Sequence, residues 1–166
     1  FANATDPDAI AAAIQPNTKL IFGEVVGNPG LDIMDVDAVG KIADEAGIPL
    51  ILDATFNTPY LLKPLEHGAS IIVHSLTKWI GGHGIAIGGA VLDGGRFDWG
   101  ASDKFPTIAS PHYAMDGINF YEEFGPTAMT AKLRAEMMYN FGPCLSPTNA
   151  FHLLQGIETL PLRMQR

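Results

Sequence analysis

The chain has 166 residues, of which 47% are hydrophobic and 17% charged, and its formal net charge is −8. This composition is typical of a folded globular domain, and the acidic balance speaks against nonspecific nucleic-acid binding, which needs clustered lysine and arginine. The single Cys144 allows no disulfide within the chain, no apolar run approaches the ~20 residues of a membrane span, and no signal segment opens it. We therefore expect a cytoplasmic protein with no nucleic-acid or membrane partner.

Apolar residues at helical or strand spacing predict an alternation of helices and strands along the chain. Helices are expected where such residues follow a capping side chain or a helix-starting segment, over 7–14, 35–46 and 62–67, and with little interruption from 119 onward. Strands are expected where short stretches are apolar on both faces, over 19–26, 49–53, 69–74 and 85–92. The segment 55–60 is expected to be a loop.

This order of elements indicates an α/β fold, a mostly parallel sheet with helices on both faces. We expect one α/β core over residues 1–146. The stretch 147–166 is expected to begin a long helix, with Phe151 and Leu154 at helical spacing, that leads to a C-terminal domain outside this chain. No internal repeat or low-complexity linker interrupts the pattern.

Polar side chains follow three of the predicted strands at the point where each strand ends. They are Asn28, Asp53 and the run Ser75–Lys78. The carboxyl ends of parallel strands share one edge of a sheet, and ligands bind there in open α/β folds. An aspartate that closes an apolar strand is costly to bury without a cation, and a lysine among hydroxyls and glycines can be desolvated enough to become nucleophilic.

Pyridoxal phosphate (PLP) is a cofactor that uses this set of groups. It takes a lysine as a Schiff base, an aspartate opposite its ring nitrogen and hydroxyl donors for its phosphate. Ser75 and Thr77 are two residues apart, so in extended backbone both hydroxyls would point the same way. Taken singly, each residue has an ordinary structural explanation, as a loop cap, a turn residue or a solvated lysine. Their occurrence together at three successive strand ends favours a binding site.

Three segments resemble the Cys/Met-metabolism family of PLP-dependent enzymes. The run 74–84 (HSLTKWIGGHG) is similar to the segment that bears the family's cofactor lysine, and 24–29 (EVVGNP) and 53–56 (DATF) are similar to two further family segments. Within the family, the chain resembles the O-acetylhomoserine sulfhydrylases at 81–84 (GGHG), 124–126 (FGP), 146–151 (SPTNAF) and 155–163 (QGIETLPLR). Relatives that handle cystathionine usually have Asn-Gly-His-Ser in place of 81–84. The resemblance covers practically the whole chain.

The resemblance implies a fold-type I PLP-dependent transferase, with residues 1–146 forming part of its PLP-binding large domain. It implies that Lys78 binds the cofactor and moves protons at Cα and Cβ of the substrate, while Asp53 keeps the ring nitrogen protonated. Glu24 would support the site without taking part in the chemistry. The resemblance also implies that Asn28 contacts the phenolic oxygen of the cofactor and that Thr55 supports its ring. Ser75 and Thr77 would donate hydrogen bonds to its phosphate. No metal is expected.

The activity implied is γ-replacement on O-acetylhomoserine: sulfide or methanethiol takes the place of acetate and gives homocysteine or methionine, as in methionine biosynthesis. The resemblance also implies a homo-oligomer, a tetramer for the full-length protein, with sites built across subunits. The family residues that stack on the cofactor, reach its phosphate from the neighbouring subunit and grip the substrate carboxylate lie outside this chain. We therefore expect weak or no turnover from the chain alone.

Other functions stay open from the sequence. A γ-lyase or a cystathionine-forming or cystathionine-cleaving enzyme of the same family would share these residues, because the outcome depends on what enters after elimination. A non-catalytic fragment or structural partner that keeps the fold without the cofactor is a further alternative, against which the joint presence of the strand-end polar residues argues. A nucleotide-binding Rossmann fold is disfavoured because no Gly-x-Gly-x-x-Gly follows a strand and opens a helix.

Overall fold

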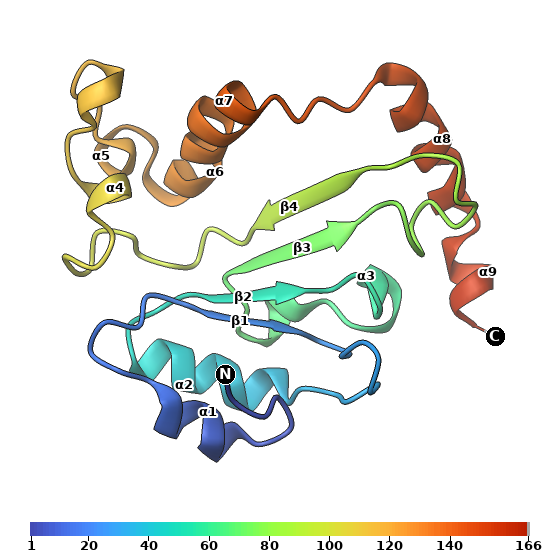
Figure 1. Ribbon diagram of the computed structural model, residues 1–166, viewed down its shortest axis with the longest axis horizontal. Coiled ribbons are helices and arrows are strands. Elements are labelled where there is room, and N and C mark those ends of the chain that lie inside the picture. The colour runs from blue at the N-terminus through green and yellow to red at the C-terminus, as the bar shows by residue number, and fades with distance from the viewer. Residues whose placement is uncertain (166) are drawn as a thin grey trace. The chain divides into compact units, whose positions relative to one another are not determined.

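The computed structural model describes residues 1–165. They divide into two compact units, one of residues 1–92 with the stretch from 145 onward, and one of residues 93–144. The first unit contains the sheet, and the second is built of short helices (Figure 1). Arg166, the last residue of the stretch 147–166 in which a long helix is predicted to begin, lies outside the described residues.

A four-stranded sheet in the order β1-β2-β3-β4 forms the centre of the first unit. Its strands are β1 (Ile21–Glu24), β2 (Leu50–Asp53), β3 (Ile71–Ser75) and β4 (Gly89–Asp93). β1 pairs with β2 and β2 with β3 in parallel, and β4 runs opposite to β3 (Figure 1). The predicted α/β class with a mostly parallel sheet is therefore confirmed.

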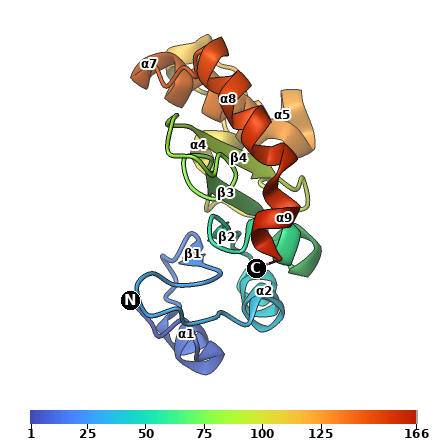
Figure 2. The ribbon, with the colours of Figure 1, turned by 90° about the vertical axis from the view of Figure 1, so that its right-hand side faces the viewer.

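One face of the sheet carries the hydrophobic core of this unit. Gly23 and Leu52 are paired in the register, and residues paired in this way point to the same face. Leu52 is fully buried there with Val39 and Ile10 in one apolar cluster. Val39 and Ile10 come from the two helices that cover this face (Figures 1 and 2), α2 (Val36–Glu45) and α1 (Pro7–Ala13).

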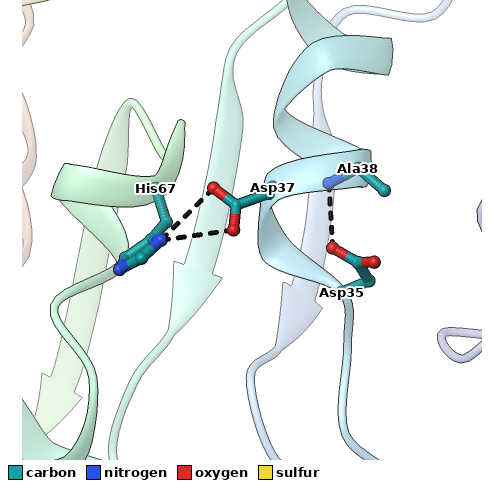
Figure 3. Close-up of polar contacts among 4 residues, drawn as sticks. All are labelled: Asp35, Asp37, Ala38 and His67. Carbon is teal, nitrogen blue, oxygen red and sulfur yellow. Dashed lines mark hydrogen bonds and ion pairs between the residues drawn. The ribbon is translucent and has the colours of Figure 1, made fainter.

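The first turn of α2 is held by two acidic side chains (Figure 3). Asp35 caps the helix, because its Oδ1 accepts a hydrogen bond from the Ala38 amide at 3.0 Å. Asp37 faces the His67 ring, whose Nδ1 lies 3.2 and 3.4 Å from its two carboxylate oxygens. This pair joins α2 to the 3₁₀ turn Pro64–His67 that precedes β3. The helix start predicted at Asp35 is confirmed.

The strands are shorter than predicted, and β1 is not covered on both faces. β1 ends at Glu24 rather than at Val26, because Val26 enters an antiparallel bridge with Ile33 instead. Phe22 points to the face opposite the core and is 61% exposed. The predicted strand over 85–92 is regular only from Gly89. The apolar stretches therefore predicted where the strands lie, but not the residues at which they end or which faces of the sheet other elements cover.

Two short helical turns fill the connection between β2 and β3. α3 (Thr58–Leu61) forms where the sequence predicts a loop, and the helical piece predicted over 62–67 is only the 3₁₀ turn described above. The buried Asn57 side chain closes α3, because its amide donates to the carbonyls of Thr58 at 3.0 Å and Leu62 at 2.9 Å. A turn held by one side-chain amide leaves no hydrophobic periodicity by which it could be predicted.

The predicted long helix from Pro147 is two helices. α8 spans Pro147–Glu158 and α9 spans Leu160–Met164. Thr159 separates them with φ −101° and ψ 3°, outside helical geometry. Pro161 is the cause, because proline has no N–H to donate to the carbonyl four residues earlier and its ring clashes with that carbonyl. The start at Pro147 is as predicted, and the proposed domain boundary there stays a prediction.

Short helices make up the second unit. The helical pattern predicted from residue 119 onward is present, but it is broken into short pieces, and one further helix and one 3₁₀ turn lie before it. The helices are α4 (Pro106–Ala109), α5 (Phe120–Phe124), α6 (Ala128–Lys132) and α7 (Tyr139–Phe141), with 3₁₀ turns at Tyr113–Met115 and Gly125–Thr127 and a π-helical turn at Leu133–Met138. Phe97, Trp99 and Phe105 pack edge to face, with ring centroids 4.8, 5.3 and 5.2 Å apart. Over residues 1–165 no helix is long and apolar enough to cross a bilayer.

Candidate active site

A cavity of about 310 Å³ opens at the carboxyl ends of β1, β2 and β3. It lies within the first unit, and nine residues line it: Glu24, Val26, Asn28, Asp53, Thr55, Phe56, Ser75, Lys78 and Trp79. Five of the six residues predicted to contact the cofactor are among them, as is the supporting Glu24. Thr77 is the one that is not.

The sheet register brings the polar residues of the cavity together. Glu24 is paired with Asp53, and Asp53 with Val73, so the three side chains point to one face of the sheet. Ser75 lies two residues beyond Val73 on the same strand and shares that face. This is the face opposite the apolar core, so strand alternation alone separates core side chains from site side chains.

Hydrogen bonds fix the loop that carries Asp53 and Thr55. The Thr55 amide donates to Asp53 Oδ1 at 2.8 Å, which leaves the other carboxylate oxygen of Asp53 without a bond to this loop. The Thr55 hydroxyl oxygen accepts from the Ser75 amide at 2.7 Å. The ends of β2 and β3 are therefore tied together at the floor of the cavity, and Asp53 is oriented before any ligand binds.

The loop after β1 is held in a similar way. The backbone N–H of Asn28 donates to Glu24 Oε2 at 2.9 Å, so Glu24 closes the turn that brings the Asn28 side chain to the cavity. This bond gives Glu24 a structural part, in agreement with a supporting role. Val26, from the same loop, adds an apolar wall.

Lys78 lies on the turn that follows β3. Its own amide donates to the Ser75 carbonyl at 3.2 Å and its carbonyl accepts from Gly82 at 2.7 Å, which makes the turn compact. The residue lines the cavity but is exposed to solvent. We expected Lys78 to be shielded from water, but residues 1–165 leave it exposed. Groups outside these residues would have to cover the cavity to desolvate the lysine.

Thr77 is placed differently from Ser75, contrary to the expectation that both hydroxyls point the same way. The backbone leaves the extended conformation after Ser75, where β3 ends. The Thr77 hydroxyl instead donates to the Gly88 carbonyl at 3.3 Å and accepts from the Gly88 amide at 3.1 Å. A hydroxyl has one proton to donate, so this bond competes with the phosphate contact predicted for Thr77.

Two aromatic residues that sequence reasoning did not assign to the site also line the cavity. Phe56 and Trp79 are 37% and 40% exposed, and each directly follows a residue predicted to bind the cofactor. Both could have been predicted to lie near the site, because they are next to Thr55 and Lys78 in the sequence. They give the cavity flat apolar walls beside its polar floor.

His74 is a buried titratable group next to the site. It precedes Ser75 on β3 and so points to the core face, where it is 5% exposed and its Nδ1 has no hydrogen-bond partner among the described residues. Burial lowers the pKa of His74, against the smaller opposing effects of a hydrogen bond to the Ala54 backbone and of the Asp53 carboxylate. The ring is therefore neutral at physiological pH.

The residues of the cavity fit PLP. An oriented carboxylate, a lysine amine, a serine hydroxyl and an asparagine amide line one cavity of the size of small-molecule sites, with apolar walls for a ring. Within residues 1–165 no three His, Cys, Asp or Glu side chains gather closely enough to hold a metal ion. The lysine amine, the serine hydroxyl and the asparagine side-chain amide of the cavity suit an organic, anionic cofactor.

Comparison with known proteins decides the family. Residues 1–166 match the family model of the Cys/Met metabolism PLP-dependent enzymes. The chain belongs to this family. Its PLP dependence, predicted from the sequence, is thereby confirmed.

Several relatives of this PLP-dependent family are similar along the whole chain. The chain is 45% identical to an O-acetyl-L-homoserine sulfhydrylase of Leptospira meyeri, with 100% of the chain and 39% of the relative covered. It is 44% identical to a homocysteine synthase of Schizosaccharomyces pombe, again with 100% and 39% covered. The chain thus spans about two fifths of the length of these relatives.

A solved structure of the same PLP-dependent family has the same fold. The chain superimposes on a Campylobacter jejuni protein assigned as O-acetylhomoserine (thiol)-lyase with a TM-score of 0.90 and 34% identity, over 97% of this chain and 40% of that one. That structure contains N′-pyridoxyl-lysine-5′-monophosphate. Its pyridoxyl-lysine supports a covalent cofactor site in this fold, and the assignment of that role to Lys78 stays a prediction.

Proposed function

We propose that this chain is part of a PLP-dependent transferase that performs γ-replacement on O-acetylhomoserine, with sulfide or methanethiol as the incoming nucleophile. The products are homocysteine or methionine, together with acetate. The observation that carries the proposal is that Asp53, Ser75 and Lys78, from the ends of two strands and the following turn, line one cavity. The similarity to an O-acetyl-L-homoserine sulfhydrylase and a homocysteine synthase supports the choice of substrate.

The proposed reaction is a substitution without oxidation or reduction. The bond between Cγ and the acetate oxygen breaks with its electron pair going to acetate, and a bond from sulfur to Cγ forms. PLP, when bound, draws electron density away from the substrate's Cα and so makes protons at Cα and Cβ removable. The Lys78 amine takes these protons and returns them, because it is the basic side chain that lines the cavity.

The other cavity residues bind and orient the cofactor. Asp53 holds a proton at the ring nitrogen with the carboxylate oxygen that Thr55 leaves open, and Thr55 supports the ring from the same loop. The side-chain amide of Asn28 donates to the phenolic oxygen, and the Ser75 hydroxyl donates to the phosphate. Thr77 joins the phosphate contact only if its hydroxyl releases Gly88.

We propose further that the protein acts in the cytoplasm as a homo-oligomer, a tetramer at full length. Support comes from the open side of the site, since Lys78, Phe56 and Trp79 are exposed in the chain although a PLP site must exclude water to work well. A second subunit is the covering group we expect. Light scattering after size exclusion of the full-length protein measures the subunit number, and a monomer with full activity would contradict this proposal.

The cofactor test is covalent trapping at Lys78. The chain, and a polypeptide of the relatives' full length that contains it (the full-length protein), are incubated with PLP, reduced with borohydride, digested and mapped by mass spectrometry. We expect a pyridoxyl group on Lys78, at least in the full-length protein, and none in a Lys78→Arg variant. If neither protein is labelled at Lys78, the proposal is wrong.

Product analysis separates the proposed transferase from a γ-lyase of the same family. The full-length protein is given O-acetylhomoserine with sulfide, with methanethiol, or with neither. Homocysteine or methionine that depends on the thiol supports γ-replacement. Ammonia and a four-carbon keto acid formed at the same rate without any thiol would show a γ-lyase instead.

A further inference from the structure

Two sequence segments that lie far apart in the chain meet behind the Lys78 turn. One is the glycine pair Gly81-Gly82 that follows Lys78, and the other is the junction of α8 and α9 around Thr159. Both belong to the first unit. The side chain that joins them is Arg163, on α9, which has no part in the site described above.

The Arg163 guanidinium donates hydrogen bonds to oxygens from both segments. Its Nη1 donates to the Trp79 carbonyl, and its Nη2 donates to the Ile80 carbonyl at 3.3 Å and to the Gly156 carbonyl at 2.6 Å. Its Nε donates to the Thr159 hydroxyl at 3.3 Å. These acceptors are three backbone carbonyls and one hydroxyl, all neutral. The guanidinium therefore holds the two segments together by hydrogen bonds and not by an ion pair.

Glycines make room for these contacts. A Cβ on Gly82 would lie 2.5 Å from Arg163 Cζ, and the φ of Gly82 is +72°, which disfavours any other residue. A Cβ on Gly81 would lie 2.7 Å from the Leu76 carbonyl oxygen, and one on Gly156 would run into the Gly81 carbonyl oxygen. Gly156 therefore allows α8 to approach the Gly81 backbone closely, and Gly82 leaves room for the Arg163 guanidinium.

The acceptors of Arg163 include the two residues that directly follow Lys78. Trp79 and Ile80 continue the turn on which Lys78 sits, and Trp79 itself lines the cavity. The Lys78 side chain is exposed and reaches the cavity only from this turn, so the direction of its Cα–Cβ bond depends on how the turn is held. A catalytic group displaced by about 1 Å can lose roughly 10²-fold in rate.

We propose that Arg163 is a positioning residue for Lys78: by binding the carbonyls of Trp79 and Ile80 it holds the lysine turn against the α8–α9 junction and fixes the direction from which Lys78 enters the cavity. This inference rests on the proposed function, because it gives Lys78 the cofactor. It assigns no direct contact between Arg163 and substrate or cofactor.

The test compares four variants of the full-length protein: Arg163→Met, Arg163→Lys, Thr159→Val and, as the control, Arg134→Met. Arg134 is an exposed arginine of the second unit. PLP is added to each apoprotein, samples are reduced with borohydride over time, and the rate of pyridoxyl formation on Lys78 is measured. Thermal unfolding of each variant is recorded alongside, so that loss of folding is distinguished from loss of positioning.

We expect Arg163→Met to slow the labelling of Lys78 about tenfold or more. Arg163→Lys keeps the charge but not the fork, so it should recover only part of the rate. Thr159→Val removes one acceptor of the guanidinium and should give a smaller loss in the same direction, whereas Arg134→Met should label as the wild type does. The kcat of each variant for the proposed reaction should fall in parallel with its labelling rate.

The proposal is overturned if folded Arg163→Met or Arg163→Lys protein labels Lys78 at the wild-type rate. If Arg163→Met does not fold, Arg163→Lys and Thr159→Val decide the question, and wild-type rates in both would overturn it. A wild-type protein that is not labelled at Lys78 would instead refute the proposed function, which keeps the two failures apart.

Discussion

The Ser75 amide donates a hydrogen bond of 2.7 Å to the Thr55 hydroxyl and so joins the ends of β2 and β3 beneath the cavity. Thr55 in turn binds Asp53 through its own amide. One threonine therefore aligns the aspartate and the serine that we assign to opposite ends of the cofactor. Its contribution can be measured apart from its predicted contact with the ring.

Replacing Thr55 by valine should weaken the site without changing its shape. Valine is close to isosteric but leaves the part-buried Ser75 amide without its acceptor, at a cost of about 1–2 kcal/mol in the free energy of unfolding. Thr55→Ser keeps the acceptor and should cost less. Urea unfolding of the full-length apoprotein measures both, and equal stability of the two variants would show that the hydrogen bond does not matter.

Asp53→Asn should abolish most activity while the fold remains. An asparagine Oδ1 can still accept from the Thr55 amide, but the negative charge on the cavity side is lost. If Asp53 holds a proton on the cofactor ring, kcat should fall about 10²-fold or more. Circular dichroism and steady-state kinetics of the full-length protein check this, with the exposed Asp103→Asn as control. A fall of less than threefold, which is less than about 0.7 kcal/mol in activation free energy, would remove Asp53 from the proposed role.

Gly156→Ala should destabilise the protein although it lies in a helix. Alanine has the higher helix propensity by about 1 kcal/mol, so an open helical position would gain stability. Here the new Cβ would run into the Gly81 carbonyl oxygen, and we expect a net loss of about 1–3 kcal/mol in the free energy of unfolding.

Gly89→Ala is the matched control for that substitution, because its Cβ would meet only the His74 carbonyl oxygen, at 3.7 Å. Denaturant unfolding of both variants gives the comparison. A Gly156→Ala protein as stable as the wild type would mean that α8 can move away from the lysine turn.

His74 should make stability depend on pH in the weakly acidic range. Because burial lowers its pKa in the folded protein below the ordinary value of 6.5, the unfolded chain binds a proton more readily. The stability that the neutral ring provides is complete above pH 6.5 and is lost as the pH falls from there towards the folded-state pKa. Unfolding free energies measured from pH 7.5 down to pH 5 should fall accordingly.

His74→Gln should flatten the slope of unfolding free energy against pH over that range. His152→Gln, a substitution of a less buried histidine on α8, serves as the comparison. A slope that survives in His74→Gln would assign the pH dependence to other groups.

The sequence by itself determined the α/β class, the polar strand ends and the family. These depend on local features: apolar stretches predict strands, and the polar residues that follow them mark the strand ends. Motifs such as 74–84 carry the family resemblance for the same reason, since they are contiguous in the chain. Which side chains of neighbouring strands share a face, as Asp53 and Ser75 do, depends on the register of the pairing.

Other features were decided only by tertiary structure, because they depend on which oxygen or side chain lies nearest in space. The Thr77 hydroxyl binds Gly88, which lies eleven residues along the chain, and not the cavity. The exposure of Phe22 depends on which face of β1 the helices cover. Arg163 reaches Trp79 and Ile80 across 84 and 83 residues. No local pattern encodes such an approach, because it follows from the packing of α8 and α9 against the lysine turn.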